Sequence, residues 1–345
     1  MPPGPPSPRS TISRRNSIRC RYCMRQRSDA ALCSRALPPP SEYPDRMTTL
    51  PQDLHAVHGP FDREQIDACA SSLGDFGTAT RHLVDEGLVP PDVLMGLTLT
   101  LLSGQPRTAR AANDGSASAI EGNVWVREQV TIHRPCGIDE LWTVTGTSAR
   151  RYVRKGRRYG VTVSRTVDAA GSVIVSNCTT GLLSYRSDES LDEVNEGLQE
   201  SEVHIPIADH TVAMPVGDIG PGHDLATRFP IEMTLELMQR RDGKSPKNPI
   251  HSDPAKARRA GLAAPIAGGS HVAAFVFELL MREWGVDVLL HGAHIDVRWK
   301  SPTFAGDQFE PTAVVISATP SLITIAIAVE PSKLQGTILI PRTSA

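Results

Sequence analysis

The stretch NPIHSDPAKARRAGLAAPIAGG, from Asn248 to Gly269, holds residues whose types and spacing could do chemistry. Asn248 and His251 lie in a short turn, and a neutral imidazole with a free ring nitrogen can accept a proton near pH 7. Gly268 and Gly269 precede a strongly apolar run, where backbone N–H groups at the start of a helix would favour a developing negative charge. The stretch therefore predicts a general base close to anion-stabilising amides.

Each of these features also has a purely structural interpretation. Asn-Pro is a common turn former, so the turn could serve the fold alone. His251 could be a structural histidine, and the glycine pair could simply allow a helix to pack closely against a sheet. The nearby His271, His291 and His294 are interpreted as packing or surface residues.

A helix that follows the turn is the best-defined element of the sequence. Its apolar positions recur at helical spacing at Val272, Phe275, Val276, Leu279 and Leu280. Glu278 and Arg282 fall on the opposite face and predict an ion pair four residues apart. Gly285 suits the C-terminal end of the helix. Because the apolar face is so broad, we expect a sheet to wrap around this helix.

The order of predicted elements is similar in the two halves of the chain. The first half begins with helical spacing over 61–73 and an apolar helix that two prolines open and that ends near Gly104. Alternating, β-branched runs then predict strands. These runs cover 123–132, 140–153, 157–168, 172–185, 291–300, 308–319 and 322–330. An acidic stretch from Arg186 to Glu202 is interpreted as a linker. The class is therefore α+β, with helices followed by antiparallel strands in each half.

Composition limits the function classes. The chain has 345 residues and a net charge of −2, which favours one large or two ordinary domains and gives no bias toward nucleic acid. The most apolar run, Val93–Leu102, is about half the roughly 20 residues that a membrane helix needs, so no membrane association is expected. Six scattered cysteines are too few for a disulfide framework and indicate a reducing, cytoplasmic setting.

Residues 1–46 differ from the rest in being rich in arginine, serine and proline. They could be a disordered basic arm, a transit-like leader, or translated sequence upstream of the true start; we favour the last, with Met47 as the first residue. Cys20, Cys23 and Cys33 have zinc-like spacing but no fourth ligand close by. No metal site and no cofactor are therefore predicted.

The turn and the helix entry resemble the MaoC-like (R)-specific enoyl-CoA hydratase family. The resemblance is carried by Asn248-Pro249-Ile250-His251, Asp253-Pro254, Ala264-Pro265-Ile266 and Gly269. Two corners add to it, Val297–Asp307 and, in the first half, Ile132–Asp139. The resemblance covers roughly residues 55–345.

The resemblance implies two tandem hot-dog domains, each an antiparallel sheet wrapped around a long helix. Their expected bounds are 55–186 for a first domain without the catalytic turn, 187–202 for the linker, and 203–345 for the MaoC-like domain. It also implies that an acyl-CoA thioester binds between the halves, as in fatty acid metabolism. A homodimer is one possible assembly, although internal pairing of the halves could make one chain a complete unit.

The resemblance also assigns roles. His251 matches the family's base, Asn248 the residue that organises the turn, and Gly269, beside Gly268, the oxyanion donor. The family's catalytic aspartate lies five residues before the histidine, where this chain has Pro246. Asp242, nine residues before His251, is the candidate replacement. Asp253 is expected on the opposite side of the turn.

Three functions remain open on these residues. The preferred one is an (R)-specific enoyl-CoA hydratase, or 3-hydroxyacyl-CoA dehydratase, with His251 as base. Pro246 in the acid position motivates the second, a non-catalytic subunit that binds acyl-CoA. The third is an acyl-CoA thioesterase, because hot-dog folds also support that chemistry and a fold alone does not fix a function.

Overall fold

The computed structural model describes residues 50–105, 124–183, 192–203, 205, 219–227, 230–243 and 248–342. The chain divides into two units, Met1–Asp45 and Arg46–Ala345, and all described residues belong to the second. The predictions for residues 1–46, with Cys20, Cys23 and Cys33, fall outside the described residues, as does Pro246.

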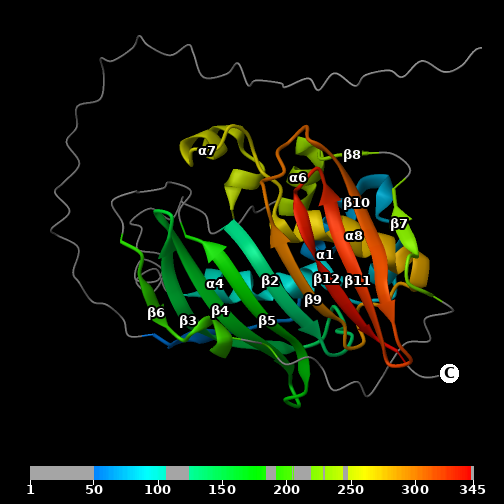
Figure 1. Cartoon of the computed structure of the whole chain (residues 1–345), viewed down its shortest axis with the longest axis horizontal. Coiled ribbons are helices and arrows are strands. Elements are labelled where there is room, and N and C mark those ends of the chain that lie inside the picture. Colours follow the sequence, from blue (N-terminus) through cyan, green and yellow to red (C-terminus); the bar gives the residue numbers. More distant parts are fainter. Residues whose placement is uncertain are drawn as a thin grey trace, which may run out of the picture. The chain divides into compact units, whose positions relative to one another are not determined.

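One antiparallel sheet of 12 strands forms the framework of the second unit (Figure 1). Its main path runs β1-β3-β4-β5-β2-β9-β12-β11-β10-β7, with β6 beside β3 and β8 beside β10. The strands of the first half are β1 (Gln52–His58), β2 (Val124–Ile132), β3 (Trp142–Arg154), β4 (Arg157–Asp168), β5 (Val173–Leu182) and β6 (Asn195–Gly197). Those of the second half are β7 (Asp224–Ala226), β8 (Ile231–Glu232), β9 (His294–Trp299), β10 (Gln308–Ala318), β11 (Leu322–Glu330) and β12 (Leu334–Pro341).

The two halves join where β2 pairs with β9, so the sheet is continuous across the chain. Val130 lies opposite Ile295 at this seam, and both side chains are fully buried. Each half also has an isolated antiparallel β-bridge, which joins the segment before the central helix to the turn between two strands. The bridge pairs Leu88 with Gly137 in the first half and Ile266 with Phe304 in the second. This repeated arrangement is consistent with two similar units placed side by side.

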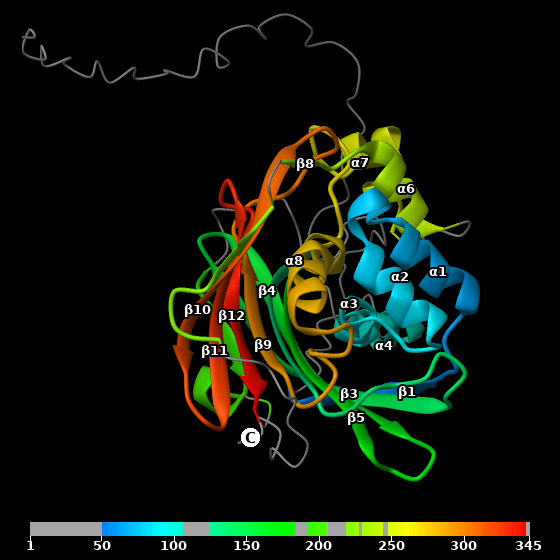
Figure 2. The same ribbon diagram turned by 90° about the vertical axis from the view of Figure 1, so that its right-hand side faces the viewer.

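The helices cover one face of the sheet, as Figure 2 shows. They are α1 (Arg63–Ser71), α2 (Thr78–Asp85), α3 (Pro91–Met95), α4 (Leu97–Gly104), α6 (Leu235–Asp242), α7 (Pro254–Arg259) and α8 (Gly269–Trp284), with 3-10 turns at η2 (Gly74–Phe76), η3 (Glu200–Glu202) and η4 (Pro249–His251). The apolar helix predicted to end near Gly104 is present as α3 and α4, which meet at Gly96.

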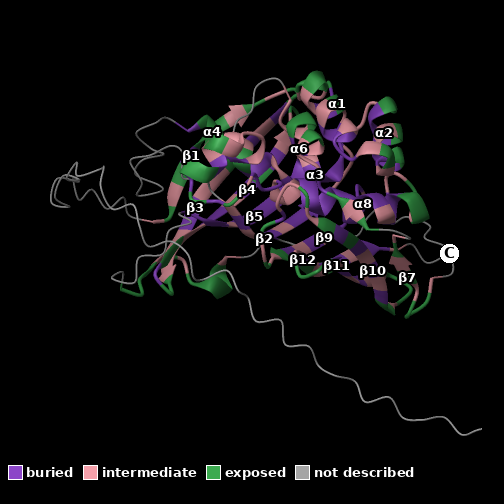
Figure 3. Ribbon diagram, turned by 90° about the horizontal axis from the view of Figure 1, so that it is seen from above, coloured by how far each residue is buried: buried purple, intermediate pink, exposed green. Residues whose placement is uncertain are grey.

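Helix α8 forms where the apolar period predicts it and packs against β10 and β11. Of its predicted apolar positions, all are buried except Leu279, which is half-buried. Gly285 ends the helix with φ of 111°, a conformation that side chains rarely adopt. Figure 3 shows the buried residues gathered between α3, α8 and the strands that face them. The predicted helix wrapped by a sheet is confirmed.

Two sequence interpretations differ from the structure. Glu278 does not pair with Arg282 on an exposed face; it is fully buried, and the Arg282 guanidinium lies 5.3 Å from the Phe76 ring centroid. The predicted linker is also partly structured, because β6 pairs with β3 and η3 follows it. Periodicity locates the faces of an element but does not tell which neighbouring segment covers them.

Glu128 is a fully buried carboxyl in the middle of the sheet. Its Oε1 accepts a hydrogen bond of 3.1 Å from Asn177, which also donates to the Met95 carbonyl. Burial raises the pKa of Glu128 from 4.5 to about 8. Between these values the folded state therefore holds a proton that the unfolded chain has released.

We therefore expect the free energy of unfolding to fall as pH rises from about 5 to about 8, by about 3–4 kcal/mol from this group alone. Glu128→Gln should remove this slope, because a neutral amide can keep the bond to Asn177. Urea unfolding at both pH values measures the difference. Glu310→Gln, on the exposed edge of β10, is the matched control and should keep the wild-type slope. Identical slopes in wild type and Glu128→Gln would contradict the assignment.

Candidate active site

The turn that carries the predicted base is a short 3-10 helix, η4, that Asn248 precedes. Pro249 fits its first position, since proline has no N–H to satisfy there. The Asp253 carboxylate accepts hydrogen bonds from the N–H groups of Ala255 and Lys256, so it caps helix α7. The Asp253 carboxylate therefore serves as the N-cap of α7.

His251 has a defined tautomer. Its Nδ1 lies 2.7 Å from the Ile266 carbonyl oxygen, which can only accept, so Nδ1 carries the proton. In the neutral ring, Nε2 is then left with a free lone pair. Burial lowers the pKa of His251 below its ordinary value, although the Ile266 carbonyl and the charge of Asp242 act in the other direction. His251 is therefore a neutral ring with a basic Nε2 at neutral pH.

Asp242 interacts electrostatically with this histidine. It is the last residue of α6, and Gly243 ends the helix with φ of 62°. Burial raises the pKa of Asp242, against a hydrogen bond from Ser252 and the charges of His251 and Arg241. The Oδ2 atom of Asp242 is buried and has no hydrogen-bond partner among the described residues. The charges of the Asp242 carboxylate and the His251 ring therefore influence each other, although nine residues separate the two in the sequence.

The N-terminus of α8 separates the two interpretations of the glycine pair. Val272 makes the first hydrogen bond of the helix, to the Gly268 carbonyl, so the amides before it have no acceptor within the helix. A Cβ at Gly269 would lie 2.8 Å from Trp125 and 3.0 Å from Trp299, whereas one at Gly268 would meet nothing within 4 Å. Gly269 therefore permits close packing, while Gly268 faces open space.

The remaining predicted residues have simpler surroundings. The Asn248 side chain makes no hydrogen bond to any residue that the structure describes. His271 is buried, and its Nε2 donates a hydrogen bond of 3.0 Å to the Ser72 carbonyl. His294 contacts Thr131 at 2.9 Å, and His291 contacts Asp287 at 3.2 Å. These three are packing and surface residues, as predicted.

Sequence reasoning missed a buried ion pair behind Asp242. Arg241 Nη2 lies 2.5 Å from Asp92 Oδ2, and the two side chains are 12% and 3% exposed. The same Nη2 donates to the Ser270 hydroxyl at 3.2 Å. One sequence signal pointed to it. Arg241 lies three positions after the apolar Met238, so both residues fall on one face of a helix, and that face is buried at Met238.

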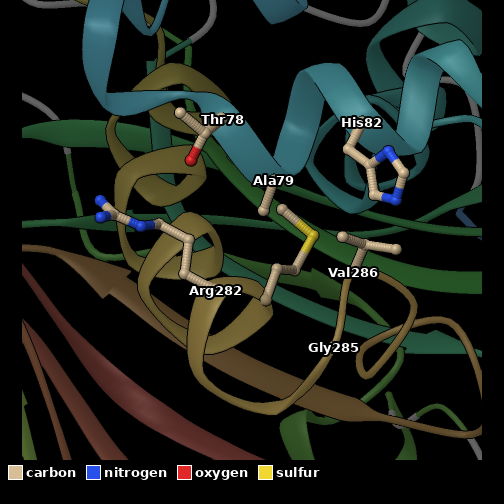
Figure 4. A pocket seen from close by; sticks show the side chains of 7 residues that line it. Thr78, Ala79, His82, Arg282, Gly285 and Val286 are labelled. Carbon is tan, nitrogen blue, oxygen red and sulfur yellow. The ribbon is translucent and has the colours of Figure 1, made fainter.

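Two surface pockets lie away from these residues. The larger, of about 450 Å³, is lined by α2 and the end of α8, with His82 and Arg282 at its sides (Figure 4). The other, of about 340 Å³, lies between Pro230, β10 and the turn at Pro331. Neither is lined by His251 or Asp242.

Within the described ranges, no group of three or more His, Cys, Asp or Glu residues could hold a metal ion. The helices of the described part are all too short or too polar to cross a membrane.

Comparison with known proteins identifies a family domain in the second half of the chain. Residues 243–321, which include η4 and α8, match the MaoC like domain family. A comparison with curated proteins returns no match. Residues 243–321 therefore resemble a MaoC like domain.

Solved structures give the fold of the whole second unit. A MaoC-like dehydratase from Phytophthora capsici superimposes with a TM-score of 0.59 at 15% identity, over 87% of this chain and 98% of that one. Another MaoC-like dehydratase gives 0.58 at 16%, over 84% and 98%. A Mycobacterium tuberculosis protein described as a double hotdog fold gives 0.55 at 12%, over 86% and 96%. The predicted α+β hot-dog fold is confirmed.

Proposed function

We propose that this protein is an (R)-specific enoyl-CoA hydratase, or 3-hydroxyacyl-CoA dehydratase in the reverse direction. The observation that carries the proposal is the Asp242–His251 pair: the charges of the two groups interact, Asp242 Oδ2 is buried without a hydrogen-bond partner among the described residues, and Nδ1 of His251 is fixed by the Ile266 carbonyl. A base and an acid at one water are what hydration of a 2-enoyl thioester requires. The match of residues 243–321 to the MaoC like domain supports an acyl thioester as the proposed substrate class.

In the proposed reaction, Nε2 of His251 removes a proton from water while the hydroxyl oxygen adds to C3 of the enoyl group. Asp242 accepts the second hydrogen bond of that water through its free Oδ2. The proton taken by the pair is returned to C2, so the product gains one whole water. The amides before Val272 at the start of α8 stabilise the charge that develops on the thioester oxygen. The expected setting is the cytoplasm, with acyl-CoA as the partner.

The alternative of a non-catalytic acyl-CoA-binding subunit depends on the absence of an acid at Pro246. Asp242 supports the enzyme instead, because its carboxylate already interacts with His251. A thioesterase would need an attacking water at the carbonyl carbon rather than at C3. Free thiol release would distinguish that reaction from hydration.

The test follows the ultraviolet absorbance of crotonyl-CoA and longer enoyl-CoA substrates, which falls as the double bond is hydrated. The wild-type protein should consume the substrate, and His251→Ala should lower kcat by about 10²–10⁴-fold because the base is lost. His291→Ala, on the surface near β9, is the control and should keep the wild-type rate. If wild type and His251→Ala share the same background rate, the proposal fails.

A further inference from the structure

The last turn of α6, from which Asp242 projects, is held mainly by the first half of the chain. Gln65 of α1 donates to the Arg241 carbonyl at 2.9 Å, and Asp92 of α3 pairs with its guanidinium at 2.5 Å. The guanidinium also donates a hydrogen bond to the hydroxyl of Ser270, in the first turn of α8. One buried side chain therefore connects α3, α6 and the helix start that supplies the amides.

This connection places a fixed positive charge next to the Asp242–His251 pair. A buried arginine keeps its charge, and the contacts of Arg241 with Asp92 and Ser270 connect the end of α6 to α3 and to the start of α8. The Arg241 and Asp92 side chains are only 12% and 3% exposed, so water and salt screen their interaction less than that of an exposed pair.

Building on the proposed function, we propose that Arg241 is a positioning residue for the Asp242–His251 pair, and that Asp92 anchors it. The first half, which has no catalytic turn of its own, thereby contributes to the active site of the second half. Arg241 itself touches no reacting atom; it acts through Asp242 and through Ser270.

The charged and titratable groups that surround this point come from four elements. They are Cys69 on α1, Asp92 on α3, His271 on α8, and His251 in η4. Burial raises the pKa of Asp242, and the positive charge of the neighbouring Arg241 acts in the opposite direction. Loss of that charge should therefore raise the pH at which Asp242 becomes protonated.

The test replaces both charges by apolar side chains, in Arg241→Met/Asp92→Leu. Replacing a buried ion pair as a unit commonly keeps a fold, whereas removing one partner leaves a buried charge unpaired. The double variant should fold, lose about 10–100-fold in kcat with little change in KM, and show the acidic limb of its pH–rate profile at higher pH. Arg241→Lys, with Asp92 kept, should restore the position of that limb and only part of the rate, because lysine has the charge without the fork.

The matched control is the exposed pair one residue away on the same helix, Glu236 with Arg240, whose side chains are 71% and 47% exposed. Glu236→Gln/Arg240→Met should leave kcat, KM and the pH limb unchanged. A double variant of Arg241 and Asp92 with wild-type kinetics and a wild-type limb would overturn the proposal.

A second readout needs no substrate. In protein labelled with ¹³C at aspartate carboxyl groups, the Asp242 resonance, assigned with Asp242→Asn, should titrate at higher pH in the double variant than in wild type. If wild type hydrates no enoyl thioester but this shift is present, the proposed function fails and the connection stands. If wild type is active and neither the titration nor the pH limb moves, only the connection fails.

Discussion

Replacing Asp242 by asparagine is expected to lower kcat for enoyl-CoA hydration by about 10²–10⁴-fold, the usual cost of losing a general acid or base. The amide has nearly the shape of the carboxyl, so packing at the end of α6 is kept, but it cannot take up or return a proton. Steady-state kinetics at saturating enoyl-CoA measures the effect. KM should change much less, because binding of the thioester does not depend on this proton.

Asp253→Asn is the matched control for this substitution. Asp253 lies two residues after His251, but its carboxylate accepts from the amides of Ala255 and Lys256 as the cap of α7. Asparagine caps a helix about as well as aspartate does, so rate and stability should stay near wild type. Comparable rates for Asp242→Asn and wild type would remove Asp242 from the mechanism. Tight acyl-CoA binding without turnover in every form would favour the binding-subunit alternative.

The contrast between these two aspartates shows what the sequence could predict about the site. The turn at His251 and the apolar period of α8 are local patterns, and both were found because the relevant residues lie close in the chain. Sequence separation alone does not indicate whether the Asp242 side chain is directed toward His251. That depends on where α6 ends and on the left-handed Gly243 that redirects the chain, with φ of 62°.

Contacts between distant segments could not be predicted at all. In the sequence, Asp92 is an acidic residue in the first turn of a helix that begins with proline. The helix dipole favours acids at that position, so nothing local indicates a distant partner. Its pairing with Arg241 exists only because the sheet joins at β2 and β9 and stacks the helices of both halves on one face. Strands β1 and β12 were also missed, although their 7 and 8 residues exceed the 6 of the predicted β9; they pair with β3, and with β11 and β9.

Glu278 has the largest expected effect on stability. Its two oxygens accept hydrogen bonds from the N–H groups of Ala79 at 2.7 Å and Thr80 at 2.9 Å, and from the Thr80 hydroxyl at 2.7 Å. These amides are at the start of α2, where a helix leaves its first N–H groups without partners. A side chain of the second half thus supplies the cap that α2 does not have in its own sequence, where Gly77 precedes it.

Glu278→Leu should therefore lower the free energy of unfolding by about 3–5 kcal/mol, because two amides and a hydroxyl would stay buried without an acceptor. Glu278→Gln keeps one acceptor oxygen and should lose less, about 1–3 kcal/mol. Urea unfolding monitored by circular dichroism measures both, with an unchanged slope against urea as the sign that the same unit unfolds.

Glu283→Gln gives the comparison on the same helix. Glu283 is exposed, and its Oε1 lies 3.1 Å from His223 Nε2, an exposed polar contact of the kind that contributes about 0–1 kcal/mol even when both groups are charged. If Glu278→Leu were no more destabilising than Glu283→Gln, α2 would have to be capped by other groups. With the expected loss, the unfolding of the two halves would be linked through this carboxylate in addition to the shared sheet, since α2 cannot keep its first turn when α8 is absent.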